Sequence, residues 1–159
     1  MTAAAAASGT TLLVVHHSPG SSLPAMLDAA RRGAARDGLE EVTVRTVAAL
    51  DLTVPDVLAA DGYLLVTPAN LGYMSGAPKH AFDTVYNDAL GATRGRPFGM
   101  MVHGESDATG ALLGIEKITT GLEWRPAADP VSVIGPPTDE HLGACEELGA
   151  IVAATALGF

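Results

Sequence analysis

The sequence has little of several residue types, and each shortage excludes a class of protein. It contains one cysteine, Cys145, so an internal disulfide and a cysteine-rich zinc site are excluded. No apolar run approaches the roughly 18 residues that cross a bilayer, so no membrane span is expected. The N-terminal segment Met1–Thr10 lacks the basic residues of a signal peptide, so the sequence predicts a cytoplasmic protein.

Basic residues are also scarce. Nine Lys and Arg against eighteen Asp and Glu give a formal net charge of −9, and nucleic-acid binding is therefore not expected. The composition is 48% hydrophobic and 17% charged, a balance that favours an ordered core over disorder. The mean hydropathy of +0.27 is high for a small domain. It suggests apolar surface that a ligand or a second subunit covers, which leaves a homodimer open.

The 159 residues suit one domain. We expect a flexible N-terminus over residues 1–10 and a folded domain over 11–159. Continuous apolar runs predict buried parallel strands at Thr11–Val15, Tyr63–Thr67 and Phe98–His103, and more mixed patterns predict edge strands near Glu41–Val47 and Pro130–Ile134. Helix-period segments alternate with them. This is the pattern of a three-layer α/β sandwich whose five-stranded parallel sheet has the order 2-1-3-4-5.

Topology and composition place the site at the same edge of the sheet. In an open α/β sheet the ligand crevice lies beyond the carboxyl ends of the strands, where the strand order reverses. Three polar loops fall there: His16–Ser22, Pro68–Gly76 and Gly104–Thr109. The first opens a helix and carries hydroxyls and Gly20 but no cation. Free helix N–H groups and neutral hydroxyls suit a terminal phosphate, although plain capping by Ser21 or Ser22 would explain the same residues.

Two segments resemble a known family. The first loop, H-H-S-P-G-S-S, is similar to the phosphate loop of flavodoxin-like FMN proteins. The segment T-P-A-N-L-G-Y-M-S-G-A-P-K-H-A-F-D, Thr67–Asp83, resembles the flavin-ring loop and following helix of tryptophan-repressor-binding-protein-type quinone oxidoreductases and NAD(P)H-dependent FMN reductases. The matching positions are Pro68, Gly72, Met74, Lys79, Phe82 and Asp83. The segment between the fourth and fifth strands lacks the additional residues that build tetramers and nicotinamide sites in those quinone oxidoreductases.

The resemblance implies a flavodoxin-like fold, bound FMN and a redox function. The function it favours is an NAD(P)H-linked quinone or flavin reductase, with NAD(P)H as candidate electron donor. Its partner would be a small redox substrate or a redox protein. Tyr73 or Leu71 would pack on the ring, and negative charge at Glu105 and Asp107 would make the flavin a stronger reductant. The predicted FMN-binding residues are His17, Ser18, Gly20, Ser21, Ser22, Pro68, Ala69, Asn70, Leu71, Gly72, Tyr73, Met74, His103, Gly104, Glu105 and Asp107.

Other functions stay open as alternatives. One alternative is an electron carrier without its own substrate, and another is a non-redox binding module that has lost FMN. A hydrolase would use Gly104–Ala108 as a nucleophile elbow around Ser106, with His141 as base, although the second glycine of that motif is absent. A receiver-like domain and a nicotinamide-binding Rossmann domain both lack their defining residues, and no pair of histidines has metal-ligand spacing.

Overall fold

A computed structural model describes residues 9–159 of the chain. Its centre is a parallel sheet of four longer strands in the order β2-β1-β3-β5, and two short strands extend it beyond β5. The longer strands are β1 (Thr10–His16), β2 (Val42–Ala48), β3 (Gly62–Asn70) and β5 (Pro97–Gly104). The predicted fold class and strand order are therefore confirmed. Most of the predicted flexible segment 1–10 lies outside the described residues, and Thr10 already pairs with Val42.

The fifth predicted strand is divided into two pieces. Both β6 (Arg125–Pro126) and β7 (Val131–Ile134) run parallel to β5, β6 near its start and β7 near its end. The sequence pattern located β7, at Pro130–Ile134, but not β6. The helix before β6 ends at Gly121, and Glu123 takes a positive φ of 58° in the turn that follows. Trp124 then stacks on Tyr63 with ring centroids 3.9 Å apart, which fixes the start of β6 against the core.

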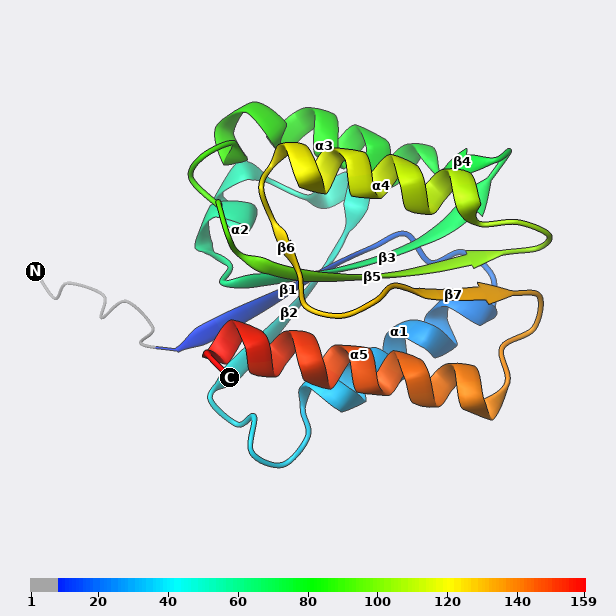
Figure 1. Cartoon of the computed structure of the whole chain (residues 1–159), viewed down its shortest axis with the longest axis horizontal. Helices are drawn as coiled ribbons and strands as arrows, with labels where there is room; N and C mark the ends of the chain where they lie inside the picture. The colour runs from blue at the N-terminus through cyan, green and yellow to red at the C-terminus, as the bar shows by residue number, and fades with distance from the viewer. Residues whose placement is uncertain (1–8) are drawn as a thin grey trace, which may run out of the picture.

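Helices cover both faces of the sheet (Figure 1). One layer consists of α1 (Ser22–Ala34) and α5 (Asp139–Leu157), and the other of α2 (Val54–Ala59), α3 (Gly76–Ala89) and α4 (Thr109–Gly121), with a 3-10 turn at Ala49–Asp51. Successive residues of a strand point to opposite faces, so Leu12 and Val14 enter the core under α1 and α5 while Leu13 and Val15 enter the other. Both faces of the central strands are thereby buried.

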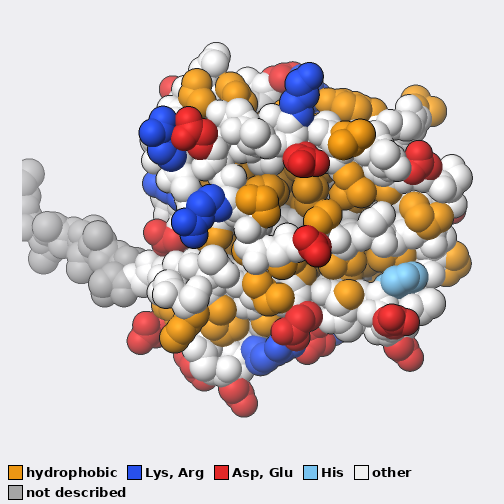
Figure 2. Space-filling model, viewed as in Figure 1, with side chains coloured by type: hydrophobic (Ala, Val, Ile, Leu, Met, Phe, Trp, Pro, Cys, Tyr) orange, Lys and Arg blue, Asp and Glu red, His pale blue; other side chains and the backbone are white. Residues whose placement is uncertain are grey.

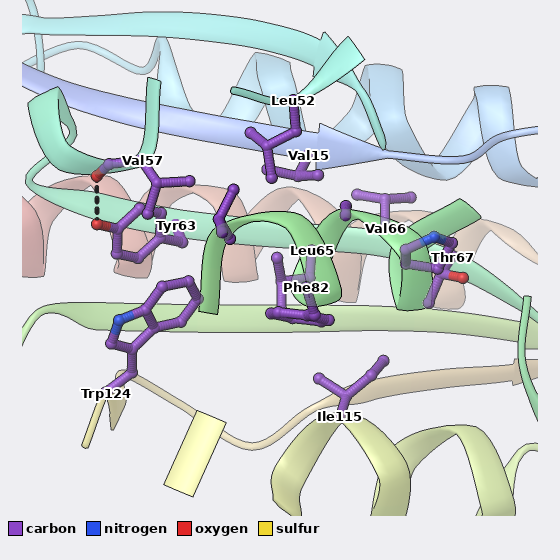
Figure 3. Close-up of a pocket in the computed structure, with 13 residues that line it drawn as sticks. Val15, Leu52, Val57, Tyr63, Leu65, Val66, Thr67, Phe82, Ile115 and Trp124 are labelled. Atoms are coloured by element: carbon purple, nitrogen blue, oxygen red, sulfur yellow. Dashed lines mark hydrogen bonds between the residues drawn. The ribbon is translucent and has the colours of Figure 1, made fainter. Parts of the chain in front are cut away.

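The core under α2, α3 and α4 retains a small apolar hollow (Figure 3). Val15, Leu65, Phe82 and Trp124 are among the side chains that line it. No charged side chain lines this hollow, so we assign it to core packing.

Hydrophobic side chains also reach the surface. Figure 2 shows them gathered over the face that α4 and α5 present to the viewer. Leu113 of α4 is 60% exposed and Ile134 of β7 is 44% exposed. Within residues 9–159 no helix is both long and apolar enough to cross a membrane.

Candidate functional site

The three predicted loops meet beyond the carboxyl ends of β1, β3 and β5. Together they line a cleft of about 720 Å³, counting its open mouth, which we call the α1 cleft. Because β1 and β3 are neighbours in register, with His16 opposite Val66, the loops that follow them emerge side by side. The lining residues are Pro19, Gly20, Ser21, Ser22, Leu23, Pro68, Ala69, Asn70, His103, Gly104 and Glu105.

The first turn of α1 forms one wall of the α1 cleft. Ser21 is the N-cap, and its hydroxyl makes no capping hydrogen bond, so the capping interpretation of that serine is not supported. The N–H groups of Ser22 and Leu23 belong to the first turn and have no intrahelical acceptor, while Pro24 has no N–H to offer. Gly20 holds a φ of +77°, which lets the backbone turn into the helix, and a Cβ at this position would meet open space. The wall therefore presents neutral donors and the positive end of a helix dipole.

The two histidines of this loop do not line the cleft. The Nδ1 atom of His16 lies 2.8 Å from the Ser18 hydroxyl. Burial lowers the pKa of His16, and the neighbouring His17 and Arg31 lower it further. His17 donates its backbone N–H to the Val66 carbonyl at 2.9 Å. His17 and Ser18, both predicted site residues, thus do not line the α1 cleft, and their hydrogen bonds hold its first loop in place.

A second cleft continues from the first. It lies between the segment 69–72 and the segment 105–107, and we call it the hairpin cleft. Ala69, Asn70 and Glu105 line both clefts, so the two form one groove. Leu71 lines the hairpin cleft from the tip of the turn, where its side chain is fully exposed and its φ is +51°. An exposed leucine in a left-handed conformation is uncommon, which makes Leu71 a candidate for a role in binding.

The segment predicted as a loop after the third strand is a β-hairpin. β3 runs on through Asn70, and β4 (Tyr73–Met74) returns antiparallel to it, with Ala69 opposite Met74. The Thr67 and Ser75 hydroxyls lie 3.2 Å apart at its buried base. The hairpin points the Met74 side chain into the core, where it is 3% exposed. Met74, predicted as a site residue, therefore lines neither cleft.

Helix α4 supports the hairpin through two glycines that the sequence analysis did not single out. A Cβ at Gly110 would lie 1.7 Å from the Gly72 carbonyl oxygen, and one at Gly114 would lie 2.6 Å from the Tyr73 ring. Tyr73 accordingly packs over α4 and lines neither cleft, although it was predicted to contact a ring. The spacing of Gly110 and Gly114, four residues apart on one face of a helix, could have indicated this close contact from the sequence.

Side chains of the third loop are largely occupied with local structure. The Nε2 atom of His103 donates to the Gly135 carbonyl at 2.9 Å, because a carbonyl oxygen only accepts. Asp107 accepts hydrogen bonds from the Thr109 hydroxyl at 2.7 Å and the Thr109 backbone N–H at 3.0 Å. These bonds lower the pKa of Asp107 and tie its carboxylate to Thr109, the first residue of α4, whose N-cap position is Ala108. Glu105 is exposed at the junction of the clefts, and no Lys or Arg lines either one.

The hydrolase alternative finds no support in this geometry. The Nδ1 atom of His141 accepts the Thr138 backbone N–H at 3.1 Å, in a capping box at the start of α5. Its ring is therefore committed to a helix cap, and no hydrogen bond joins it to Ser106 in the described part of the chain. Residues 9–159 also contain no group of three His, Cys, Asp or Glu side chains placed to hold a metal ion.

Comparison with known proteins identifies the fold. No family model and no curated protein matches the sequence. Among solved structures, the chain is similar to a flavodoxin from the domain Archaea (TM-score 0.76, 18% identity, covering 93% of this chain and 99% of the flavodoxin). It is also similar to two-electron reduced Megasphaera elsdenii flavodoxin (TM-score 0.76, 19% identity, covering 90% of this chain and 98% of that one). A third similar structure is the flavodoxin, WrbA-like protein from Agrobacterium tumefaciens (TM-score 0.70, 19% identity, covering 94% of this chain and 98% of that one). The fold is flavodoxin-like, as the sequence resemblance implied.

Proposed function

We propose that this chain binds FMN in the groove formed by the α1 and hairpin clefts and acts as an oxidoreductase. The observation that carries the proposal is the continuity of the groove. It joins neutral phosphate donors at the start of α1 to a slot between two exposed loops, at the position where a flavodoxin-like sheet reverses its strand order. The solved flavodoxins with the same fold support the choice of cofactor.

The α1 cleft suits the phosphate end of FMN. The N–H groups of Ser22 and Leu23, with the Ser21 and Ser22 hydroxyls, would donate to phosphate oxygens, and the helix dipole would favour the negative charge. The α1 cleft has no Lys or Arg in its lining, and this is consistent with phosphate binding because several aligned neutral donors are able to take the place of a cationic side chain. Gly20 keeps the backbone free of a side chain at the mouth.

The hairpin cleft suits the ring. Leu71 would cover apolar ring surface, and the backbone of Asn70–Gly72 would face its polar edge. Bound FMN would supply hydride and electron transfer; the protein orients the ring and sets the charge around it. Glu105 stands at the junction, where its negative charge would oppose an anionic reduced ring.

A reductase is the activity we favour over a pure electron carrier. No aromatic side chain lines the hairpin cleft, and the wall opposite Leu71 carries the small Ser106. This leaves a ring face open to a flat electron acceptor such as a quinone or a free flavin. NAD(P)H is the candidate donor. An electron carrier, whose partner would be a redox protein, and a binding module without flavin are the remaining alternatives.

Two measurements test the proposal. The first is the visible absorption spectrum of the freshly purified protein, followed by titration with FMN and, in parallel, with riboflavin. We expect FMN to bind at least tenfold more tightly than riboflavin, because only FMN carries the phosphate. A colourless protein that takes up neither compound would contradict FMN binding.

The second measurement separates a reductase from a carrier. Holoprotein is mixed anaerobically with NADPH or NADH, and then with a quinone. A reductase loses its flavin absorbance with the nucleotide and regains it with the quinone. If FMN is bound but neither nucleotide reduces it, the carrier alternative replaces the reductase.

A further inference from the structure

The two edges of the sheet are built very differently. Beyond β5, the sheet ends in β6, two residues long, and β7, four residues long, with Pro130 before β7 and Pro136 after it. Short strands and flanking prolines prevent another chain from pairing with an edge. The opposite edge, β2, is seven residues long, contains neither proline nor glycine, and keeps an unbroken register with β1 from Val42 to Ala48.

The outer side of β2 has no strand partner within residues 9–159, where β1 is its one neighbour in the sheet. Thr43, Arg45 and Thr46 are exposed. Arg45, the one charged residue of the strand, is held by Asp56 of α2 at 2.9 Å on the α2 side of the sheet. The strand therefore offers a free row of backbone donors and acceptors flanked by β-branched side chains, a combination suited to adding another strand.

A groove runs beside this edge on the α1 side. It has a volume of about 810 Å³, counting its open mouth, and is lined by Asp28, Arg31, Arg32, Ala35 and Val44. Asp28, Arg31 and Arg32 of α1 and its C-cap, Ala35, recur at helical spacing and form one stripe. Arg31 makes no ion pair within the described part of the chain, and the Arg32 Nε atom reaches the Glu146 carboxylate only at 3.9 Å. Two exposed guanidinium groups therefore line this groove together with one carboxylate, that of Asp28, so the groove carries a net positive charge on an acidic protein.

We propose that β2 is a docking edge for an extended segment of a partner protein that carries carboxylates on one face. The segment would add to the sheet through main-chain hydrogen bonds. Its alternate side chains would enter the groove, where Asp or Glu would meet Arg31 and Arg32. This inference does not depend on FMN binding, because no residue of β2 lines the α1 cleft or the hairpin cleft.

Charge argues against a second copy of the chain as the occupant. Antiparallel pairing of two β2 strands about a two-fold axis would place both α1 helices on the same side of the joined sheet. The two grooves would then lie on either side of the axis, and because each has two arginines against the one carboxylate of Asp28, like net charges would be brought together, which is destabilising. A partner strand with carboxylates at alternate positions would instead be attracted to the arginines. Glu41 is exposed just before β2 and would repel a carboxylate placed beside it, so the partner's carboxylates should lie opposite the middle of β2.

The test uses the full chain and synthetic peptides. An eight-residue peptide alternates glutamate with valine and threonine, and a matched peptide has lysine in place of each glutamate. Binding is followed by amide chemical shifts and by hydrogen exchange of the Val42–Ala48 amides. We expect the glutamate peptide to shift and protect β2 amides, and the lysine peptide to bind at least about tenfold more weakly.

Two controls separate strand addition from simple charge attraction. Arg31→Glu should weaken the glutamate peptide about tenfold, whereas Arg125→Glu, the same charge change at the opposite edge, should leave it unchanged. Methylating alternate peptide nitrogens should abolish binding when the methyl groups face β2 and have little effect when they face away. Equal binding of both peptides, no protection of β2, or a dimer joined through β2 would overturn the proposal.

Discussion

At the residue scale, the mouth of the α1 cleft depends on Gly20. Its φ of +77° and the open space around it keep a side chain out of the proposed phosphate position. We predict that Gly20→Asp weakens FMN binding by at least about 2 kcal/mol, roughly thirtyfold, because the carboxylate repels the phosphate at short range. Fluorescence titration of the apoprotein with FMN measures the change.

A matched variant separates this charge effect from backbone strain. Gly38 also has a positive φ, of 93°, and open space around it, but it follows the other end of α1. Gly38→Asp should therefore cost similar stability and leave FMN affinity unchanged. If both variants bind FMN equally well, the phosphate has been placed wrongly.

At the scale of elements, the hairpin β3–β4 and helix α4 are fitted to each other. An alanine at Gly110 would put its Cβ within bonding distance of the Gly72 carbonyl, so the hairpin must move. We predict that Gly110→Ala lowers FMN affinity about tenfold and costs about 1–3 kcal/mol of stability. Gly76→Ala, at the unobstructed start of α3, is the control and should change neither quantity by much. Unchanged FMN affinity in Gly110→Ala would separate the hairpin from the ring site.

The α1–α5 layer is fitted in the same way. A Cβ at Gly149 would lie 2.0 Å from the Ala30 carbonyl oxygen, whereas one at Gly143 of the same helix meets nothing within 4 Å. We predict that Gly149→Ala lowers the free energy of unfolding by about 2–4 kcal/mol, because the helices must separate. Gly143→Ala should raise it by up to about 1 kcal/mol through helix propensity. Chemical denaturation measures both, and similar values for the two variants would refute this account of the packing.

At the scale of the whole molecule, stability should respond to pH through His16. Burial lowers the pKa of His16 in the folded state below its unfolded value of 6.5. The unfolded chain then binds more protons between the two values, so folding stability falls as the pH drops below about 6.5. His16→Asn should flatten this part of the stability profile between about pH 7.5 and pH 5. An identical profile in the variant would show that other groups cause the loss.

The sequence located the loops of the candidate site but not all of the side chains that line it. Gly20, Ser21 and Ser22 line the α1 cleft, because the loop that follows a parallel strand leaves at the carboxyl edge of the sheet. From the sequence, Tyr73 and Leu71 were equally suitable as ring contacts. The structure distinguishes them, because the hairpin packs Tyr73 against Gly114 and leaves Leu71 exposed at the tip of the turn.

What the sequence determined by itself is the order of the strands and the edge at which their loops meet. Continuous apolar runs require burial on both faces, and right-handed crossovers then restrict the topology. The tertiary structure decided the division of the last strand between Pro126 and Val131, the packing of the hairpin on Gly110 and the contrast between the sheet edges. These features arise from contacts between residues far apart in the chain, which periodicity along one segment does not encode.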